Sequence, residues 1–265
     1  MTPLISVLIP AYNHFTEVMA CLTSLQMYAS KQLAITFLIQ DDASPEVYLP
    51  AVVPPCSASV KRNPENLGFV GNVNAGAARA DGDILFIVNQ DVLAVGQDAD
   101  GGTLSQDWDI HLVNAFADLA VGVVGAKLLF PDGRIQNAGG FFDGRLQPFH
   151  RGLGYSNHRY AEVNTPEEVT WTTGAAFAVR RDLFTALGGF DPVYAPSYFE
   201  DTDFCLRARE AGFKVWYEPK CVFIHTVGTT GGSPFFHRSA ATFRQRWVDS
   251  KRITADVSAV KERFW

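Results

Sequence analysis

Cysteine is scarce in this 265-residue chain, and its four cysteines form no C-x-x-C pair. Their positions are scattered: Cys21, Cys56, Cys205 and Cys221. Such spacing excludes a dense disulfide framework and favours reduced thiols. Cys221 and His225 form a C-x3-H pair, but no second pair completes a zinc site.

Positive charge is also in short supply. Lys and Arg number 22 against 28 Asp and Glu, which gives a net charge of −6 and a pI near 5.5. A chain without a basic surplus lacks the charge that neutralises phosphates along a duplex, so we expect no nucleic-acid partner. Basic residues become frequent only near the C-terminal end, where Arg244, Arg246 and Arg252 lie.

Long apolar runs are absent too. No stretch approaches the ~18 to 20 residues that span a bilayer, and the first residues lack the features of a signal peptide. We therefore expect a cytoplasmic protein. Peripheral contact with a membrane and a homodimer both stay open.

The N-terminal half alternates between two apolar patterns. Continuous apolar or β-rich runs at 4–10, 33–39, 59–62, 84–88 and 121–129 predict strands, and apolar residues at helical spacing predict helices at 16–30, 71–79 and 108–119. This alternation predicts an α/β fold, with a mostly parallel sheet flanked by helices. Ligands of such sheets bind beyond the carboxyl ends of the strands.

The pattern changes after Pro131. Residues 131–166 are rich in Gly, Asn, His and aromatics, and predict a hairpin with a long functional loop rather than a second core. Beyond them we expect strands at 169–180 and 220–224 and helices at 181–187 and 200–211. The tail from Ser233 onward predicts one or two helices, either solvated or offering a weakly cationic face.

Three carboxylates crowd into four positions at Glu200, Asp201 and Asp203. Like charges held this close raise at least one carboxyl pKa, and a carboxylate with a raised pKa is suited to accept a proton from a hydroxyl. The alternative is an acidic first turn of a helix, in which Asp203 faces Arg207 at i,i+4.

Seven segments in order carry a family resemblance. They are VLIPAYN (7–13), QDDAS (40–44), NLGFVGNVNAG (66–76), GDILFIVNQD (82–91), WTTGA (171–175), GGFD (188–191) and EDTD (200–203). Together they resemble the family 2 glycosyltransferases of the GT-A fold, in particular the rhamnosyltransferase-like branch, over about residues 4–230. The resemblance implies one Rossmann-like GT-A domain at 1–232, with a nucleotide-sugar-binding half (1–130) and an acceptor-binding and catalytic half (131–232), followed by a helical tail (233–265).

The resemblance also implies the donor site, for a dTDP- or UDP-linked sugar. Asp42 would accept the imide N–H of uracil or thymine, and Tyr12 would lie against the base or ribose; an Asx-turn with Ser44 is the alternative for Asp42. The full implied nucleotide-binding set is Pro10, Tyr12, Asp42, Ser44, Asn66, Gly68, Asn74 and Asn89.

A divalent metal, Mn²⁺ or Mg²⁺, is implied on the donor diphosphate. Asn89-Gln90-Asp91 stands where the family has D-x-D, so the first carboxylate is replaced by an amide and Asp91 is left as the acidic ligand. His225 resembles the histidine that completes the metal site, and an imidazole ligand favours Mn²⁺. A core or loop histidine is the alternative.

For catalysis, the resemblance makes Asp201 the base of a single displacement that inverts the anomeric centre of the sugar. Glu200 and Asp203 would orient the base and the acceptor, which would be a saccharide or a lipid-linked saccharide. Trp171, Thr173 and Gly174 would form the floor between donor and acceptor, with core packing as the alternative for Trp171. A sugar nucleotidyltransferase and a catalytically weak carbohydrate- or nucleotide-binding protein on the same fold remain competing interpretations.

Overall fold

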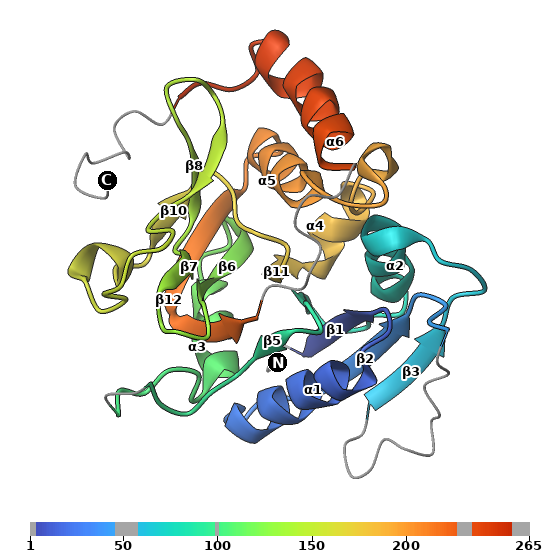
Figure 1. The fold of residues 1–265 in the computed structure, drawn as a ribbon, viewed down its shortest axis with the longest axis vertical. Helices are drawn as coiled ribbons and strands as arrows, with labels where there is room; N and C mark the ends of the chain where they lie inside the picture. Colours follow the sequence, from blue (N-terminus) through green and yellow to red (C-terminus); the bar gives the residue numbers. More distant parts are fainter. Residues whose placement is uncertain (1–3, 46–57, 99–100, 227–234, 256–265) are drawn as a thin grey trace.

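The four apolar runs between residues 4 and 88 form adjacent parallel strands. Figure 1 shows the computed structural model, which describes residues 4–45, 58–98, 101–226 and 235–255. The strands β1 (Ile5–Ala11), β2 (Ile35–Asp41), β3 (Ala58–Arg62) and β4 (Ile84–Val88) lie in the order β4-β1-β2-β3. Ala11 pairs with Asp41, so the strands β1 and β2 end side by side.

The sheet continues beyond β4 with strands of both directions. β11 (Ala176–Arg180) runs antiparallel between β4 and β6 (Val121–Leu129), and β12 (Lys214–His225) runs parallel to β6. The short strands β10 (Glu167–Val169), β5 (Val92–Leu93) and β7 (Ile135–Asn137) pair antiparallel with β12, β12 and β6. A separate pair is formed by β8 (Gly140–Phe142) and β9 (Pro148–His150).

Helices cover both faces of this sheet and create two cores. The core under α1 (Phe15–Tyr28) and α3 (Trp108–Ala115) takes Val7 and Ile9 of β1. The core on the other face takes Leu8 of the same strand, with the helices α2 (Gly68–Ala77), α4 (Arg181–Ala186) and α5 (Glu200–Glu210). Because both faces of β1 are buried, its sequence is apolar except for Ser6. The predicted α/β fold, with a central sheet flanked by helices, is confirmed.

The predicted strand at 169–180 is wrong in part, because only Val169, the last residue of β10, and the whole of β11 are strand. Between them the chain leaves the sheet, and the backbone N–H groups of Thr170 and Trp171 donate to the carbonyl of Gly140. The predicted strand at 220–224 is the second part of β12. A bulge between Glu218 and Val222 interrupts the longer strand, and its charged residues conceal the apolar pattern.

Residues 131–166 contain the predicted hairpin, formed by β8 and β9, and they form no second core of their own but join the core that also holds α5. Ile135, Phe142 and Val163 are fully buried in the cluster that also holds α5. The 3₁₀ helix η2 (Ala161–Val163) completes this segment.

The tail packs against the same core. The 3₁₀ helix η3 (Pro192–Tyr194) precedes α5, and α6 (Phe235–Phe243) is followed by the π-helical turn η4 (Arg244–Asp249). Figure 1 shows α6 above α5. Phe243 and Trp247 are 2% and 1% exposed, so the described part of the tail is not a solvated helix. The expected boundary at 232/233 lies outside the described residues.

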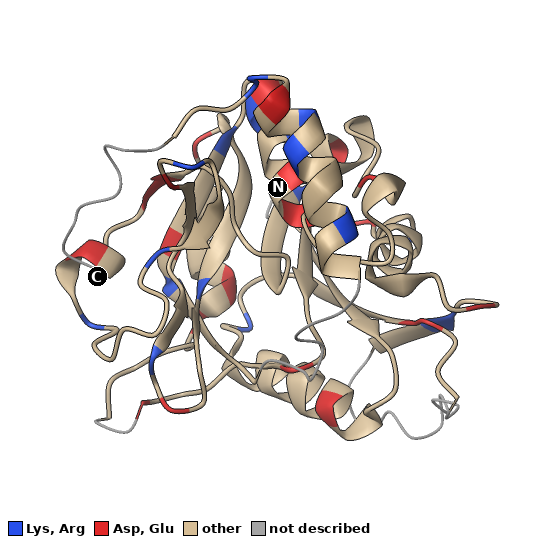
Figure 2. Ribbon diagram, turned by 45° about the horizontal axis from the view of Figure 1, so that its top comes forward, with Lys and Arg blue, Asp and Glu red and all other residues tan. Residues whose placement is uncertain are grey.

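Two arginines of the tail form ion pairs with residues earlier in the chain. Arg246 contacts Asp191, and Arg252 contacts Glu210. Across the molecule, Lys and Arg are interspersed with Asp and Glu (Figure 2). In the described ranges, no helix is long and apolar enough to cross a membrane.

Cys21, Cys205 and Cys221 are free and buried, whereas Cys56 lies outside the described residues.

Candidate active site

The ends of β1 and β4 are joined by a side chain that sequence reasoning missed. The backbone N–H of Tyr12 donates to Oε1 of Gln90 at 2.8 Å, and Nε2 of Gln90 donates to the carbonyl of Tyr12 at 3.3 Å. Pro10 lies on β1 just before this junction, and the Tyr12 side chain is 45% exposed. The ring is therefore free to meet a ligand beyond the carboxyl ends of the strands.

Two neighbouring aspartates at the end of β2 have different surroundings. Asp41, not Asp42, makes the turn with Ser44, whose backbone N–H donates to Oδ1 of Asp41 at 3.0 Å. Asp42 is 2% exposed, and its Oδ1 accepts from the backbone N–H of Leu67 at 2.8 Å and from Asn63 at 2.9 Å. Asp42 thus ties the end of β2 to the start of α2.

Asn66 and Gly68 shape the loop before α2. Asn66 donates to the carbonyl of Asp42 at 3.2 Å and accepts from the backbone N–H of Gly68 at 3.2 Å. Gly68 has φ +71°, and a Cβ there would lie 2.4 Å from Cβ of Pro196, so only glycine fits this close approach. Asn74 of α2 exchanges two hydrogen bonds with the backbone of Phe190, at 2.8 and 3.0 Å, so its amide binds the turn at 188–191 rather than facing the strand ends.

Asp91 and His225, the two candidate metal ligands, are 134 positions apart in the sequence but adjacent in the structure. Pairing of β5 with the end of β12 places Oδ1 of Asp91 3.1 Å from Nε2 of His225. Nδ1 of His225 lies 2.6 Å from Oε1 of Gln136, a residue that sequence reasoning missed. Because the second ring nitrogen is held, the histidine is oriented for ligation through Nε2.

The residues at this position partly fit a divalent metal. Asp91 and His225 supply one carboxylate and one imidazole, and no group of three His, Cys, Asp or Glu ligands occurs among the residues that the structure describes. Oδ1 of Asn89 is buried without a hydrogen-bond partner, which leaves one more oxygen able to accept from a ligand or from metal-bound water. Such a set suits an ion that takes its remaining ligands from substrate phosphates.

Asp201 is the second residue of α5, and backbone N–H groups fix its carboxylate. Its Oδ2 accepts from the backbone N–H of Gly174 at 2.8 Å, and its Oδ1 accepts from the backbone N–H of Thr202 at 2.6 Å. Burial nevertheless raises the pKa of Asp201 above its usual range. Burial and the neighbouring Asp201 raise the pKa of Glu200 well above normal, and Oε2 of Glu200 has no hydrogen-bond partner.

The chain enters α5 through two strained residues. Tyr198 and Phe199 have φ of 78° and 69°, a left-handed conformation that is uncommon for non-glycine residues. Strain of this kind costs on the order of 1–3 kcal/mol per residue and concentrates at functional sites. It turns the backbone so that Glu200 and Asp201 fall in the first turn of the helix.

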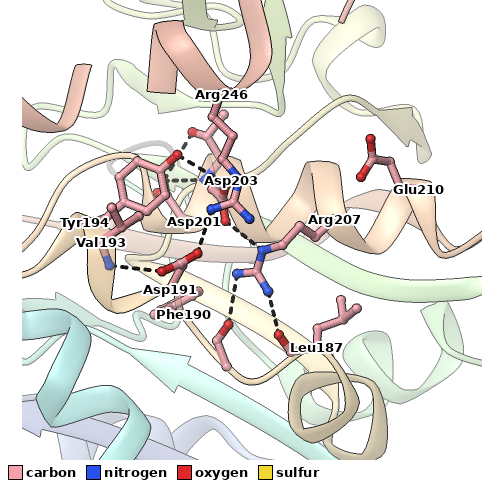
Figure 3. A network of polar contacts seen from close by, with 12 residues as sticks. Leu187, Phe190, Asp191, Val193, Tyr194, Asp201, Asp203, Arg207, Glu210 and Arg246 are labelled. Carbon is pink, nitrogen blue, oxygen red and sulfur yellow. Dashed lines mark hydrogen bonds and ion pairs between the residues drawn. The ribbon is translucent and has the colours of Figure 1, made fainter. Parts of the chain in front are cut away.

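Asp203 faces the protein interior instead of an acceptor (Figure 3). It is fully buried, and its oxygens accept from Nε of Arg207 at 2.7 Å, Nε1 of Trp247 at 2.8 Å and the hydroxyl of Tyr194 at 3.2 Å. Arg246 is a further ion-pair partner at 3.2 Å. The i,i+4 pairing with Arg207 offered as the alternative in the sequence is present.

The expected floor between donor and acceptor is only partly open. Trp171 is 4% exposed, its Nε1 donates to the carbonyl of Phe141 at 3.0 Å, and its ring meets the edge of His150. These contacts match the core-packing alternative. Thr173 is half-buried, and its hydroxyl accepts from the backbone N–H of Ala175 at 3.4 Å.

One short segment connects the candidate base with the candidate metal residues. The backbone N–H of Gly174 holds Asp201, and the carbonyl of the next residue, Ala175, accepts from the backbone N–H of Asn89 at 2.9 Å. The motifs around residues 89–91 and 200–201 therefore meet at adjacent positions of one backbone segment.

Comparison with known proteins identifies the family. The model described as "Glycosyl transferase family 2" matches residues 6–188, more than half of the chain. The chain belongs to this family. The match ends before Glu200, so Asp201 and His225 lie beyond it.

Named relatives of this glycosyl transferase family 2 member are distant. The "Pre-mycofactocin glycosyltransferase" of Mycobacterium tuberculosis is 25% identical over 92% of the chain and 48% of the relative. The "N-acetylglucosaminyl-diphospho-decaprenol L-rhamnosyltransferase" of the same organism is 30% identical over 50% of the chain and 48% of the relative. "Uncharacterized protein y4gI" of Sinorhizobium fredii is 27% identical over 95% of the chain and 27% of the relative. The chain thus spans half or less of the length of these relatives.

Solved structures share the fold. The structure titled "Crystal structure of GalNAc-T7 with UDP, GalNAc and Mn2+" has a TM-score of 0.73 at 18% identity, over 95% of this chain and 49% of that one. The mannosyltransferase PcManGT from Pyrobaculum calidifontis, in complex with GDP-Man and Mn²⁺, has a TM-score of 0.63 at 20% identity, over 100% of this chain and 68% of that one. The likeness supports the GT-A architecture.

Proposed function

We propose that this protein is an inverting glycosyltransferase that moves a sugar from a nucleoside diphosphate donor to a hydroxyl of a saccharide or lipid-linked acceptor. The proposal rests mainly on two hydrogen bonds at one backbone segment: Gly174 binds Asp201, and the next residue, Ala175, binds Asn89. A displacement needs a base on one side of the anomeric carbon and a site for the leaving diphosphate on the other, and these motifs supply both.

In the proposed reaction, Asp201 removes the proton of the acceptor hydroxyl. The new bond forms between the acceptor oxygen and the anomeric carbon while the bond from that carbon to the diphosphate oxygen breaks, and the proton stays on Asp201. The raised pKa of Asp201 makes it a stronger base than an ordinary aspartate. The hydrogen bonds from Gly174 and Thr202 fix its orientation before the acceptor binds.

Asp91 and His225 are the residues that would hold Mn²⁺ or Mg²⁺, which would offset negative charge on the departing diphosphate. Gln136 keeps the imidazole oriented, and Gln90 fixes the backbone of Tyr12 beside the base and ribose. UDP and GDP-Man in the titles of the fold neighbours support a nucleotide-sugar donor. The rhamnosyltransferase relative supports dTDP-rhamnose as the first donor to test, with UDP-sugars next.

The structure narrows the residues that would meet the acceptor. Glu200 keeps an oxygen without a protein partner and adjoins Asp201, so it remains a candidate for orienting the acceptor. Asp203 and Trp171 are committed to interior contacts, and we propose that they support the site from within.

The Asp201→Asn variant tests the mechanism. An amide keeps the shape of the side chain but cannot accept the proton, so turnover should fall by ~10² to 10⁴ while nucleotide binding stays nearly unchanged. The measurement is nucleoside diphosphate release from a panel of dTDP- and UDP-sugars with Mn²⁺. Asp182→Asn, at the start of α4, is the matched control. Near-normal turnover of Asp201→Asn would remove this residue from the mechanism.

Asn89 favours a second candidate function, a nucleotide-sugar-binding protein with little turnover, because an amide binds metal less strongly than a carboxylate. The same assay separates the two functions. A binding protein would be stabilised by the donor yet release no diphosphate from any donor in the panel.

A further inference from the structure

A cavity lies away from the candidate active site. It has a volume of about 350 Å³ and lies between β6, β12, α3, Asp98, residues 102–106 and residues 158–164. This volume falls at the lower end of the roughly 300–1,000 Å³ typical of small-molecule sites. Asp91, Asp201 and His225 do not line it. On β12, Val222 lines the cavity and His225 follows three residues later, so the two sites are about 10 Å apart along the strand.

A buried lysine lines this cavity. Lys127 is 1% exposed, and its ammonium group donates to Oδ1 of Asn164 and, at 3.3 Å, to the carbonyl of His158. Both acceptors are neutral, and no carboxylate of the described residues forms an ion pair with Lys127. A buried charge normally has an ionic partner, so this ammonium group requires an explanation.

The rest of the lining adds positive charge. Arg159 and Lys220 join Lys127 as cations, and Asp98 is the one acidic residue among the lining residues. Asp98 is already engaged, since its Oδ2 contacts Arg159 and lies 3.2 Å from Nε2 of His158. Arg159 and Asp98 therefore pair with each other, and Lys127 and Lys220 are the lining cations without an ion-pair partner among the described residues.

The surroundings of Lys127 point the same way. Burial, together with Arg151 nearby, lowers the pKa of Lys127 to about 8, although the carboxylate of Glu218 acts in the opposite direction. Arg151 itself has one buried guanidinium nitrogen without a hydrogen-bond partner. An anion in the cavity would supply the missing countercharge to this face of the sheet.

We infer that this cavity binds the phosphate group of a small molecule, with Lys127 at its base and Arg159 and Lys220 at its rim. The site is separate from the place proposed for the donor diphosphate. An ammonium group that donates to only two neutral acceptors keeps a third N–H for a phosphate oxygen. Lys220 is exposed, so the rim is open to an entering ligand.

The test uses the full chain with inorganic phosphate as the probe, in EDTA and at constant ionic strength set with sodium chloride. Phosphorus NMR line broadening measures binding directly, and the rise in melting temperature with phosphate concentration shows whether binding saturates. We expect saturable binding to the wild type, weakened about tenfold or more in Lys127→Met because one charge-assisted hydrogen bond is lost. Lys214→Gln is the matched control, since it changes a lysine of the neighbouring strand β12 that does not line the cavity. It should bind as the wild type does.

A second cavity-lining variant and a competition with UDP complete the test. If Lys127→Met does not fold, the rim variant Arg159→Gln/Lys220→Gln replaces it and should weaken binding severalfold. Titration in the presence of saturating UDP and Mn²⁺ should leave phosphate binding intact. Loss of phosphate binding on addition of UDP, or equal binding by wild type and the cavity variants, would overturn the inference without affecting the proposed transferase reaction.

A parallel titration with glucose 1-phosphate identifies the source of the phosphate group. Tighter binding than that of inorganic phosphate would assign the remaining volume to a phosphorylated sugar, whereas equal binding would assign the site to the free oxyanion. Both results require the cavity that Lys127 lines.

Discussion

Replacing Asp203 by asparagine should destabilise the protein more than any exposed charge change. The substitution removes the negative charge that two guanidinium groups share, while Nε1 of Trp247 can still donate to the amide oxygen. The new amide N–H₂ is a donor, so it cannot replace the oxygen that accepts from Nε of Arg207.

The size of the effect follows from burial. The side chains of Asp203 and Arg207 are 0% and 13% exposed, and breaking a buried pair of this kind costs about 3–5 kcal/mol. In the variant, Arg246 keeps its ion pair with Asp191 at 2.6 Å, and Arg207 keeps its hydrogen bonds to two backbone carbonyls. These remaining contacts favour a loss of unfolding free energy at the lower end of that range, about 3 kcal/mol. At ~2–4 °C per kcal/mol for a large domain, the melting temperature should fall by roughly 6–12 °C.

Urea denaturation followed by circular dichroism measures this loss. The control is Asp132→Asn, which breaks an ion pair with Arg134 of similar length, 2.8 Å, between side chains 53% and 51% exposed. An exposed pair contributes about 1 kcal/mol at most, so the control should unfold almost as the wild type does. A loss in Asp203→Asn no larger than in the control would refute the account of a charge network that stabilises α5.

Other perturbations test the candidate active site. Asp91→Ala and His225→Ala should each weaken nucleoside diphosphate binding in Mn²⁺ but not in EDTA, and calorimetric titration showing equal loss in both would indicate a structural role instead. Glu200→Gln should raise the melting temperature at pH 8, because burial raises the pKa of Glu200 and its ionised form opposes folding. The stability contributed by protonated Glu200 is full below the unfolded pKa of about 4.3 and is lost as pH rises through the folded pKa. The variant's advantage should therefore disappear near pH 4 in thermal scans, and a lower melting temperature at pH 8 would contradict the sign.

Local sequence patterns predicted the strands of the first half well. β4 is entirely apolar and β1 is apolar except for Ser6, because both faces of each strand are buried, and such runs are recognisable in a short window of sequence. β12 was found only in part, since Lys214 and Glu218 interrupt its pattern and a bulge divides its register.

Long-range contacts of polar side chains could not be predicted in the same way. Gln90 pairs with a backbone 78 positions away and Gln136 with a histidine 89 positions away, and neither contact leaves a local signal. The crowded carboxylates at 200–203 marked an unusual site. They did not show that Asp203 turns inward, because its partner Trp247 lies 44 residues further along the chain.

The contact between Asp203 and Trp247 also bears on the order in which the chain folds during synthesis. When α5 leaves the ribosome, Asp203 has Tyr194 and Arg207 available, but Arg246 and Trp247 have not yet been made. Domains generally fold as units while synthesis proceeds from the N-terminus. Here α5 gains its contacts with Arg246 and Trp247 only after residue 247 has emerged, so the packing of this helix is completed by a turn whose Trp247 is synthesised 44 residues after Asp203.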